Sequence, residues 1–281
     1  MRRAAFTLLL VLLLGGFAGI RWHAGTPSSL IEVVCSADAD RTALGDRLLP
    51  PFAHAADGSL RVLGTDQLGR PLGIRLCLAL GTSLLIAGVG AVVALGIGTA
   101  VGVTAALAGE RLDNLLMRVA EITAGIPAVL VIMVLVAALR PWGVWVLFAA
   151  MGLLFWQGVA RVVRARVLRL RNELYVDAAR AIGASGWHRL RRHILPATWP
   201  TVLTFGSLLL PKLILLESLL AYLGVTGGTP HSFGRIISGV TATLTPLSAS
   251  WWPVIVPCAA LALFVLSLNL VLDLQADQSV R

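Results

Sequence analysis

The chain has 281 residues, of which 57% are hydrophobic and only 13% are charged, whereas soluble domains carry about 25% charged residues. The apolar residues form long unbroken runs instead of amphipathic patterns, which excludes an ordinary soluble domain and predicts membrane-spanning helices. The net charge of +9 comes almost wholly from arginine, since Lys212 is the only lysine. Because these arginines cluster between apolar runs, they indicate membrane topology and not nucleic-acid binding.

The first apolar run covers residues 4–20 and follows a pair of arginines. We interpret residues 1–22 as an uncleaved first transmembrane helix rather than a secretory signal peptide. The small-residue cleavage pattern is poor, and Trp22 is a typical interfacial anchor. Residues 23–75 are polar and contain several prolines, which predicts an extracytoplasmic loop with short helices at most, followed by a pre-helix segment.

The remaining apolar runs lie in a permease core at residues 76–273 and predict five further spans. These spans are expected at residues 82–107, 115–139, 143–160, 200–223 and 253–271. With the first helix they make an all-α, polytopic membrane protein of about six transmembrane helices. Six crossings place both termini on the same side of the membrane.

Positive charge indicates which side that is. Nine arginines lie between Arg161 and Arg192, a density that no other connection approaches. Cytoplasmic loops retain positive charge, so the loop at residues 161–196 is expected to be cytoplasmic. Both termini, including the tail at residues 274–281, are then cytoplasmic, and the protein is expected to be a multi-pass protein of the cell (inner) membrane.

The second expected span carries small residues at intervals of four. They are Gly90, Ala94, Gly98, Gly102 and Ala106. This spacing places them on one face of a helix, where missing side chains allow another helix to approach closely. We therefore expect a helix-packing role, and not a nucleotide-binding loop, for this segment.

The arginine-rich loop contains an alanine-rich stretch at residues 175–183 that ends in Gly183. Glycine permits a sharp turn after a helix. A basic, amphipathic stretch follows at residues 187–193, and Pro196 is expected to end it before the next span begins. Two short helices joined at a glycine across the cytoplasmic face are suited to a groove on another protein.

This loop resembles the EAA motif of binding-protein-dependent ABC importer permeases, with Asp177 in place of the usual Glu. The ending at residues 192–196 resembles the peptide and nickel branch in particular. Further hallmarks of that branch stand at residues 63–70, at residues 217–224, and at Asn269, Leu270 and Asp273. The likeness runs almost continuously from about residue 61 to residue 273.

The sequence also departs from the family pattern. Pro71 stands where the family usually has Asp, Leu272 replaces a common Gly, and Lys212 inside a span is unusual. These departures concern the choice of substrate and not membership of the family.

The resemblance implies an ABC type I importer permease-like fold, with this chain forming half of a pathway for peptides delivered by an extracytoplasmic binding protein. The implied partners are a homologous second permease subunit, two cytoplasmic ATPase subunits, the binding protein and membrane lipid, but no nucleic acid. ATP and Mg would be used by the partner ATPases, and no cofactor or metal is expected on this chain. Two alternatives stay open: nickel or metal-chelate import by the same architecture, and a stand-alone secondary transporter.

The resemblance also implies that the loop is the coupling helix that docks into the ATPase. Asp177 would cap or pair at the docking surface, Gly183 would set the bend, and nearby arginines would meet acidic residues. The residues assigned to coupling are Asp177, Ala178, Ala179, Gly183, Arg189, His193, Leu195 and Pro196. The alternative is that Asp177 only caps a helix and the arginines only maintain topology.

Lys212 and Glu217 are ionisable residues deep in the span at 200–223, beside Pro211. Such residues cost roughly 2.5 kcal/mol or more on insertion scales, so they usually face a cavity or each other. One hypothesis is that they line the translocation path. The others are that they pair, contact the partner permease or extend to the membrane surface.

No catalytic machinery is evident, and the chain is expected not to be an enzyme. A P-loop requires Gly-Lys-Ser/Thr, but the sole lysine follows Pro211. Ser185 stands in a Gly-Ala-Ser-Gly stretch outside any expected span, with no histidine at membrane depth to activate it. Arg118 and Glu121, one helical turn apart, are expected to form a structural ion pair. A bridge between Cys35 and Cys77 outside the cytoplasm stays open.

Overall fold

The computed structural model describes residues 39, 41–139, 144–225, 231–241 and 250–279. The expected first transmembrane helix at residues 1–22 and Cys35 lie outside these described residues. The chain divides into two compact units, which are described separately. The first unit combines residues 1–86 with 214–271, and the second combines residues 87–213 with 272–281.

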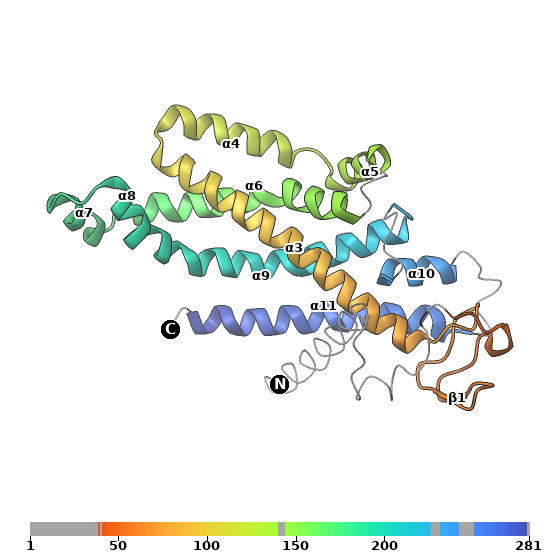
Figure 1. Cartoon of the computed structure of the whole chain (residues 1–281). Helices are drawn as coiled ribbons and strands as arrows, with labels where there is room; N and C mark the ends of the chain where they lie inside the picture. Colours follow the sequence, from red (N-terminus) through yellow and green to blue (C-terminus); the bar gives the residue numbers. More distant parts are fainter. Residues whose placement is uncertain (1–38, 40, 140–143, 226–230, 242–249, 280–281) are drawn as a thin grey trace. The chain divides into compact units, whose positions relative to one another are not determined.

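The described residues are almost entirely helical, which confirms the predicted all-α class (Figure 1). The helices are α3 (Leu72–Leu107), α4 (Glu110–Ala124), α5 (Ala128–Ala138), α6 (Val144–Leu170), α7 (Leu174–Ala181), α8 (Gly186–Arg189), the π-helical turn η3 (Leu190–Ile194), α9 (Leu195–Tyr222), α10 (Phe233–Thr241) and α11 (Trp252–Ser279). The segment before α3 contains the short 3₁₀ helix η1 (Leu44–Asp46) and a small antiparallel hairpin of β1 (Ala53–His54) and β2 (Leu60–Arg61).

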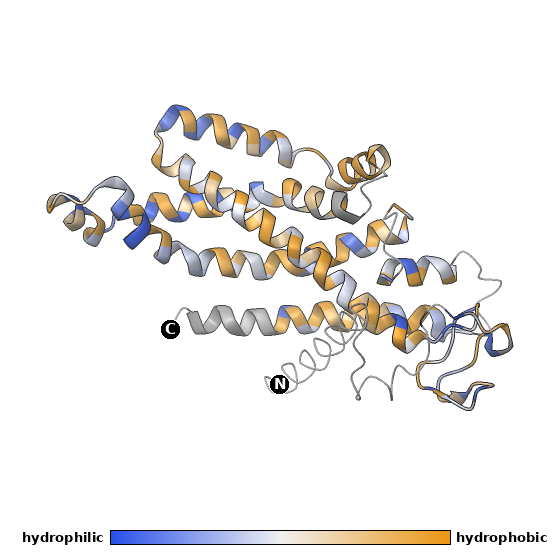
Figure 2. Ribbon diagram, in the orientation of Figure 1, coloured by the Kyte–Doolittle hydropathy of each residue, from blue (hydrophilic) through white to orange (hydrophobic). Residues whose placement is uncertain are grey.

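Three of the described helices are long and apolar enough to cross a membrane, or four if a bent pair counts as one span. The three are Leu72–Leu107, Gly186–Tyr222 and Trp252–Leu270. Figure 2 shows that hydrophobic residues predominate along much of α3 and throughout α5. The span expected at 143–160 lies on α6 but does not meet this test, so the total of six crossings stays a prediction.

The span expected at residues 115–139 is not a single straight helix but a bent pair of helices. Helix α4 ends at Ala124, α5 begins at Ala128, and the two axes differ by 81°. Pro127 precedes α5 with an extended backbone, and proline disfavours a helical conformation for the residue before it. The N–H of Gly125 bonds to the carbonyls of Glu121 and Ile122, which closes α4 before the break. The composition also changes at the break, because α4 carries five charged residues and α5 carries none.

In the second unit, the small residues of α3 lie against α6. A Cβ atom on Gly98 would stand 2.6 Å from the carbonyl oxygen of Trp156, and one on Gly102 would stand 2.6 Å from the carbonyl oxygen of Ala160. A Cβ on Gly90 would similarly meet Met151, at 2.9 Å. Ala94, which belongs to the same row of small residues, is fully buried. The backbones of the two helices are therefore close enough to exclude larger side chains on this face.

Helices α4 and α5 also pack on α6. The carboxylate of Asp113 on α4 accepts two hydrogen bonds from the guanidinium of Arg164 on α6, a bidentate and partly buried ion pair. Bidentate arginine pairs combine charge with a fixed geometry, so this one sets the register of α4 on α6. Arg118 and Glu121 form the expected pair at 3.4 Å. Both of their side chains are exposed, so this pair contributes little stability.

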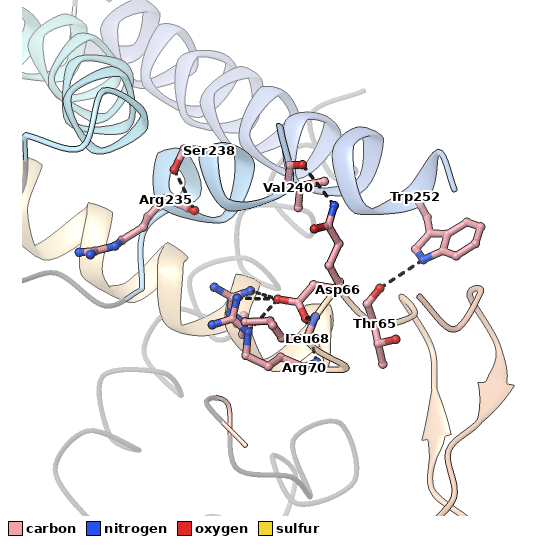
Figure 3. A network of polar contacts seen from close by, with 10 residues as sticks. Thr65, Asp66, Leu68, Arg70, Arg235, Ser238, Val240 and Trp252 are labelled. Atoms are coloured by element: carbon pink, nitrogen blue, oxygen red, sulfur yellow. Dashed lines mark hydrogen bonds and ion pairs between the residues drawn. The ribbon is translucent and has the colours of Figure 1, made fainter. Parts of the chain in front are cut away.

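In the first unit, residues 63–70 fold around the carboxylate of Asp66, which is only 3% exposed (Figure 3). Arg70 and Arg75 donate to its Oδ2 at 2.8 and 2.7 Å. The backbone N–H groups of Leu68 and Arg70 donate to its Oδ1, both at 2.9 Å. A buried carboxylate is tolerated only when it is paired and hydrogen-bonded in this way.

The segment at residues 63–70 also forms hydrogen bonds with two helices that come much later in the chain. The indole N–H of Trp252 at the start of α11 donates to the carbonyl oxygen of Thr65, at 3.3 Å. The side-chain amide of Gln67 donates to the carbonyl oxygen of Val240 in α10, also at 3.3 Å (Figure 3). The Asp66 cluster therefore fixes the turn from which α10, α11 and the start of α3 are positioned.

We expect Gly98→Ala to lower the thermal midpoint of the purified protein, because its methyl group would overlap the backbone of α6 and overpacking costs about 1–3 kcal/mol. Gly96→Ala is the matched control, since a Cβ there meets nothing within 4 Å. Unfolding in detergent, followed by tryptophan fluorescence, measures both midpoints. Equal midpoints for the two variants would contradict the close approach of α3 and α6.

We expect Asp66→Asn to destabilise the protein severely, by about 3–5 kcal/mol, because it removes the carboxylate from the buried guanidinium of Arg75 and the partly buried one of Arg70. Asp57→Asn is the control, because the side chain of Asp57, which pairs with Arg61 in the same segment, is 54% exposed. Denaturant unfolding of both variants tests the difference. A loss for Asp66→Asn no larger than that for the control would show that the cluster is not structurally required.

Candidate functional site

The loop at residues 161–196, which carries the residues assigned to coupling, begins on the last part of α6 and lies within the second unit. Arg171, just beyond α6, donates to the carbonyl oxygen of Ala106 near the end of α3, at 3.0 Å. This bond caps an otherwise unsatisfied carbonyl at a helix end. It also fixes the exit of α6 against α3, so the loop starts from an anchored point.

Helix α7 ends in a closed turn at Gly183. The N–H of Gly183 donates to the carbonyl of Arg180, and the N–H of Ala184 donates to the carbonyl of Ala179, both at 3.0 Å. This pair of bonds is a Schellman motif, which requires a left-handed residue after the helix. Gly183 has φ 86°, and a Cβ there would meet nothing within 4 Å. Glycine is thus favoured at this position by the left-handed backbone conformation and not by a lack of room for a side chain.

The loop has two helical arms, of which α7 is the first and α8 with η3 the second. The second arm begins at Ser185. Its hydroxyl accepts a hydrogen bond from the N–H of His188, at 3.3 Å, and so caps α8. Serine is a preferred residue at this position. The role of Ser185 in the structure is therefore that of a helix cap.

The expectation that Pro196 ends this arm is wrong. Helix α8 continues through η3 into α9, so that one helical element runs from Gly186 to Tyr222. In η3, the N–H of Leu195 donates to the carbonyl of Leu190, five residues earlier. A π-helical turn inserts one extra residue, and proline is tolerated in the first turn after such a change of register. The loop is therefore continuous with the span that follows it.

Aromatic rings join the two arms of the loop. The ring of His193 lies 6.1 Å from the ring of Tyr175 on α7 and 6.3 Å from the ring of His188 on α8. The buried side chains of Val176 and Ile194 lie on the same two arms. These ring contacts connect α7 with α8 and η3.

The structure places most of the residues assigned to coupling on the surface. Asp177 forms an exposed ion pair with Arg180, at 3.3 Å. It is not the N-cap of α7, because Glu173 occupies that position. The remaining assigned residues divide by burial: Ala178, Gly183, Leu195 and Pro196 are exposed, Arg189 and His193 are half-buried, and Ala179 is buried. Ala179 therefore packs inside the loop instead of lying on its outer face.

Sequence reasoning missed the large apolar side chains that the loop exposes. Leu174 and Ile182 are each 86% exposed, and Trp187 is 69% exposed. Leu174, Ala178 and Ile182 repeat at intervals of four, which places them on one helical face. That spacing was readable in the sequence, but only the structure shows that no described residue covers this face.

Cationic residues surround these apolar groups. A cavity of about 580 Å³ lies between the end of α6, α7 and α8, and Arg171, Arg180 and Arg189 line it. A neighbouring hollow of about 460 Å³ is lined partly by Arg191 and Arg192. The loop thus presents exposed apolar side chains beside arginines, a composition that suits a partner surface with apolar pockets and an acidic rim.

Lys212 and Glu217, the two residues considered for the translocation path, have different surroundings. The Nζ of Lys212 lies 5.1 Å from the centre of the Phe155 ring, in a cavity of about 430 Å³ in the second unit. Attraction between an ammonium and an aromatic face stabilises this position. Lys212 is exposed to that cavity, which is consistent with a residue that a solute can reach.

Glu217 in the first unit is fully buried. The hydroxyl of Ser83 on α3 donates to its Oε2 at 2.7 Å, and the hydroxyls of Ser218 and Ser232 also lie at the carboxyl group. Helix α10 comes close here, because a Cβ on Gly234 would overlap the carbonyl oxygen of Ser218. Glu217 therefore cross-links α3, α9 and the start of α10, and this geometry favours a structural role.

The chain is similar to known transport proteins over most of its length. The family described as "Binding-protein-dependent transport system inner membrane component" matches residues 98–281. The dipeptide transport system permease protein DppC of Bacillus subtilis is 31% identical over 234 residues, which is 83% of this chain and 70% of that protein.

Two further relatives extend the likeness. The oligopeptide transport system permease protein OppC of Haemophilus influenzae is 34% identical over 75% of this chain and 67% of its own length. A putative peptide transport system permease protein of Brucella suis is 33% identical over 97% of this chain and 86% of its own length. With its apolar spans and all-α fold, this multi-pass membrane protein belongs to the family of binding-protein-dependent transport system inner membrane components.

Proposed function

We propose that this chain is a permease subunit of an ATP-driven peptide importer and forms half of its translocation pathway. The observation that carries the proposal is the loop at residues 161–196, which combines a rigid glycine turn with exposed apolar and cationic side chains. It is continuous with α9, a helix long enough to span the membrane. Family membership and relatives with peptide-permease names support the same function.

In this proposal the loop docks into a groove on a cytoplasmic ATPase subunit. Ile182, Leu174 and Trp187 would enter apolar pockets, while the surrounding arginines would meet acidic residues at the rim. Because α8, η3 and α9 form one helical element, movement of the docked loop would pass directly to the span. Rigid-body rocking of spans around a central pathway is a general route to alternating access.

The assembly that we propose contains this chain, a homologous second permease, two ATPase subunits and an extracytoplasmic binding protein. ATP and Mg would act only on the ATPase subunits. The nine arginines between Arg161 and Arg192 support a cytoplasmic location for the loop. With six crossings, both termini would also be cytoplasmic, and the membrane would be the cell (inner) membrane.

Peptides are favoured over nickel or a metal chelate because the relatives named above are peptide, dipeptide and oligopeptide permeases. A stand-alone secondary transporter is less well supported, since its function would not require an exposed docking loop. Reconstitution separates these functions: import of peptide should require ATP, the ATPase subunits and the binding protein together. Import by this chain alone would contradict the proposal.

We expect Ile182→Asp to weaken co-purification of the ATPase subunits and to lower peptide uptake by about tenfold or more. The change removes an exposed apolar anchor, and central interface residues contribute about 2 kcal/mol or more to binding. Leu44→Asp is the control, because Leu44 is similarly exposed on a segment outside the loop. Normal co-purification and uptake in Ile182→Asp would exclude this face of α7 from the interface.

We expect Gly183→Val to reduce coupling as well, because a β-branched residue at φ 86° is strained by about 1–3 kcal/mol and distorts the angle between α7 and α8. Gly186→Ala is the control, since Gly186 has no positive φ and a Cβ there has room. The measurements are stimulation of ATP hydrolysis by the binding protein and peptide uptake. If both stay normal in Gly183→Val, the glycine turn does not set the docking geometry.

A further inference from the structure

The break between α4 and α5 opens a cavity of about 430 Å³ in the second unit, within the size range of small-molecule sites. Helices α6 and α9 complete its wall. The lining residues are Thr123, Ala124, Ile126, Pro127, Ala128, Leu154, Phe155, Gln157, Gly158, Arg161, Phe205, Leu208, Leu209 and Lys212. No acidic residue is among them, so the described wall carries positive charge only.

Lys212 and Arg161 supply that charge from two different helices, α9 and α6. Within the part of the chain that the structure describes, no carboxylate lies within ion-pair distance of either cation. The Phe155 ring holds the ammonium of Lys212 in the cavity. Both side chains are exposed, and an anionic ligand in the cavity would give these two cations a counter-ion.

The backbone adds a third source of positive potential. Ile126, Pro127 and Ala128, which line the cavity, form the entry to the eleven-residue helix α5. The first N–H groups of a helix have no partner within it, and the helix dipole places partial positive charge there. Broken membrane helices commonly direct such ends at the anionic group of a solute.

The rest of the wall suits an organic ligand better than an inorganic ion. Phe155, Phe205 and Leu208 provide an apolar side. Gln157 also lines the cavity, and its buried Oε1 has no hydrogen-bond partner among the described residues. A ligand that combines a carboxylate, amide N–H groups and apolar side chains would match the cations, this acceptor and the apolar side together.

We propose that this cavity binds the C-terminal carboxylate of a peptide in transit, with Lys212 as its main counter-ion and Arg161 and the start of α5 in support. The inference deepens the proposed function and rests on it. Lys212 is thereby a specificity-determining residue for substrates with a free carboxylate. A hydrogen bond to a charged group contributes enough that its loss should reduce binding by about tenfold or more.

Because Lys212 is the only lysine of this chain, amine-reactive labelling gives a direct test on the intact transporter in proteoliposomes. Mass spectrometry of the fragment that contains Lys212 measures its rate of modification. N-acetyl-trialanine should slow the reaction, whereas N-acetyl-trialanine amide, which lacks the carboxylate, should not. Equal protection by both peptides, or by neither, would overturn the proposal.

The same measurement separates a peptide from an anionic lipid headgroup. In vesicles of neutral lipid, protection by N-acetyl-trialanine should persist. If labelling slows only when phosphatidylglycerol is present and the peptide has no further effect, then the cavity holds lipid and the proposal is wrong.

Uptake of trialanine gives an independent readout. Lys212→Met should lower uptake about tenfold, while Lys212→Arg, which keeps the charge, should restore most of it. Arg118→Met is the control for loss of a positive charge elsewhere in the unit. Normal uptake in Lys212→Met would overturn the site but leave the importer function intact, whereas absence of uptake in the unmodified transporter would overturn the importer function itself.

Discussion

The requirement that every backbone N–H and C=O group find a partner inside an apolar environment governs this structure. It explains the long uninterrupted helix α3 and the single helical element from Gly186 to Tyr222. It also explains how the chain departs from a regular helix. Just before Pro196 the π-helical turn η3 keeps the ladder bonded, whereas the ladder is interrupted between Ala124 and Ala128, where Pro127 lines a cavity.

Buried ionisable side chains also need partners, and the kind of partner differs from site to site. Asp66 is buried between two arginines and two backbone N–H groups. Glu217 is buried among serine hydroxyls, and Asp113 pairs with Arg164. The carboxylates of Glu217 and Asp113 connect segments far apart in the sequence, whereas that of Asp66 closes a local turn. Lys212 differs because its ammonium lies in a cavity beside an aromatic ring, and no carboxylate among the described residues forms an ion pair with it. It is therefore a candidate binding group and not a structural one.

The loop at residues 161–196 is bonded internally and joined to the helix that follows it. The Schellman bonds at Gly183, the contact between the rings of Tyr175 and His193, and the continuity of η3 with α9 make these connections. Leu174, Ile182 and Trp187 nevertheless stay exposed among the described residues. In the proposed function, these two features together would allow movement of an ATPase partner to pass to the span.

The sequence by itself determined the membrane class, the all-α fold, the glycine turn at Gly183 and the family, because each depends on composition or on residues close together in the chain. The 81° break after Ala124 was not predicted, although Pro127 and the change from the charged helix α4 to the apolar helix α5 mark its place. Nor could the sequence separate Lys212 from Glu217, two ionisable groups on one helix. Glu217 is enclosed by serines from other segments, whereas Lys212 faces a cavity. Only the tertiary packing shows this difference, because the partners of each side chain come from distant parts of the chain.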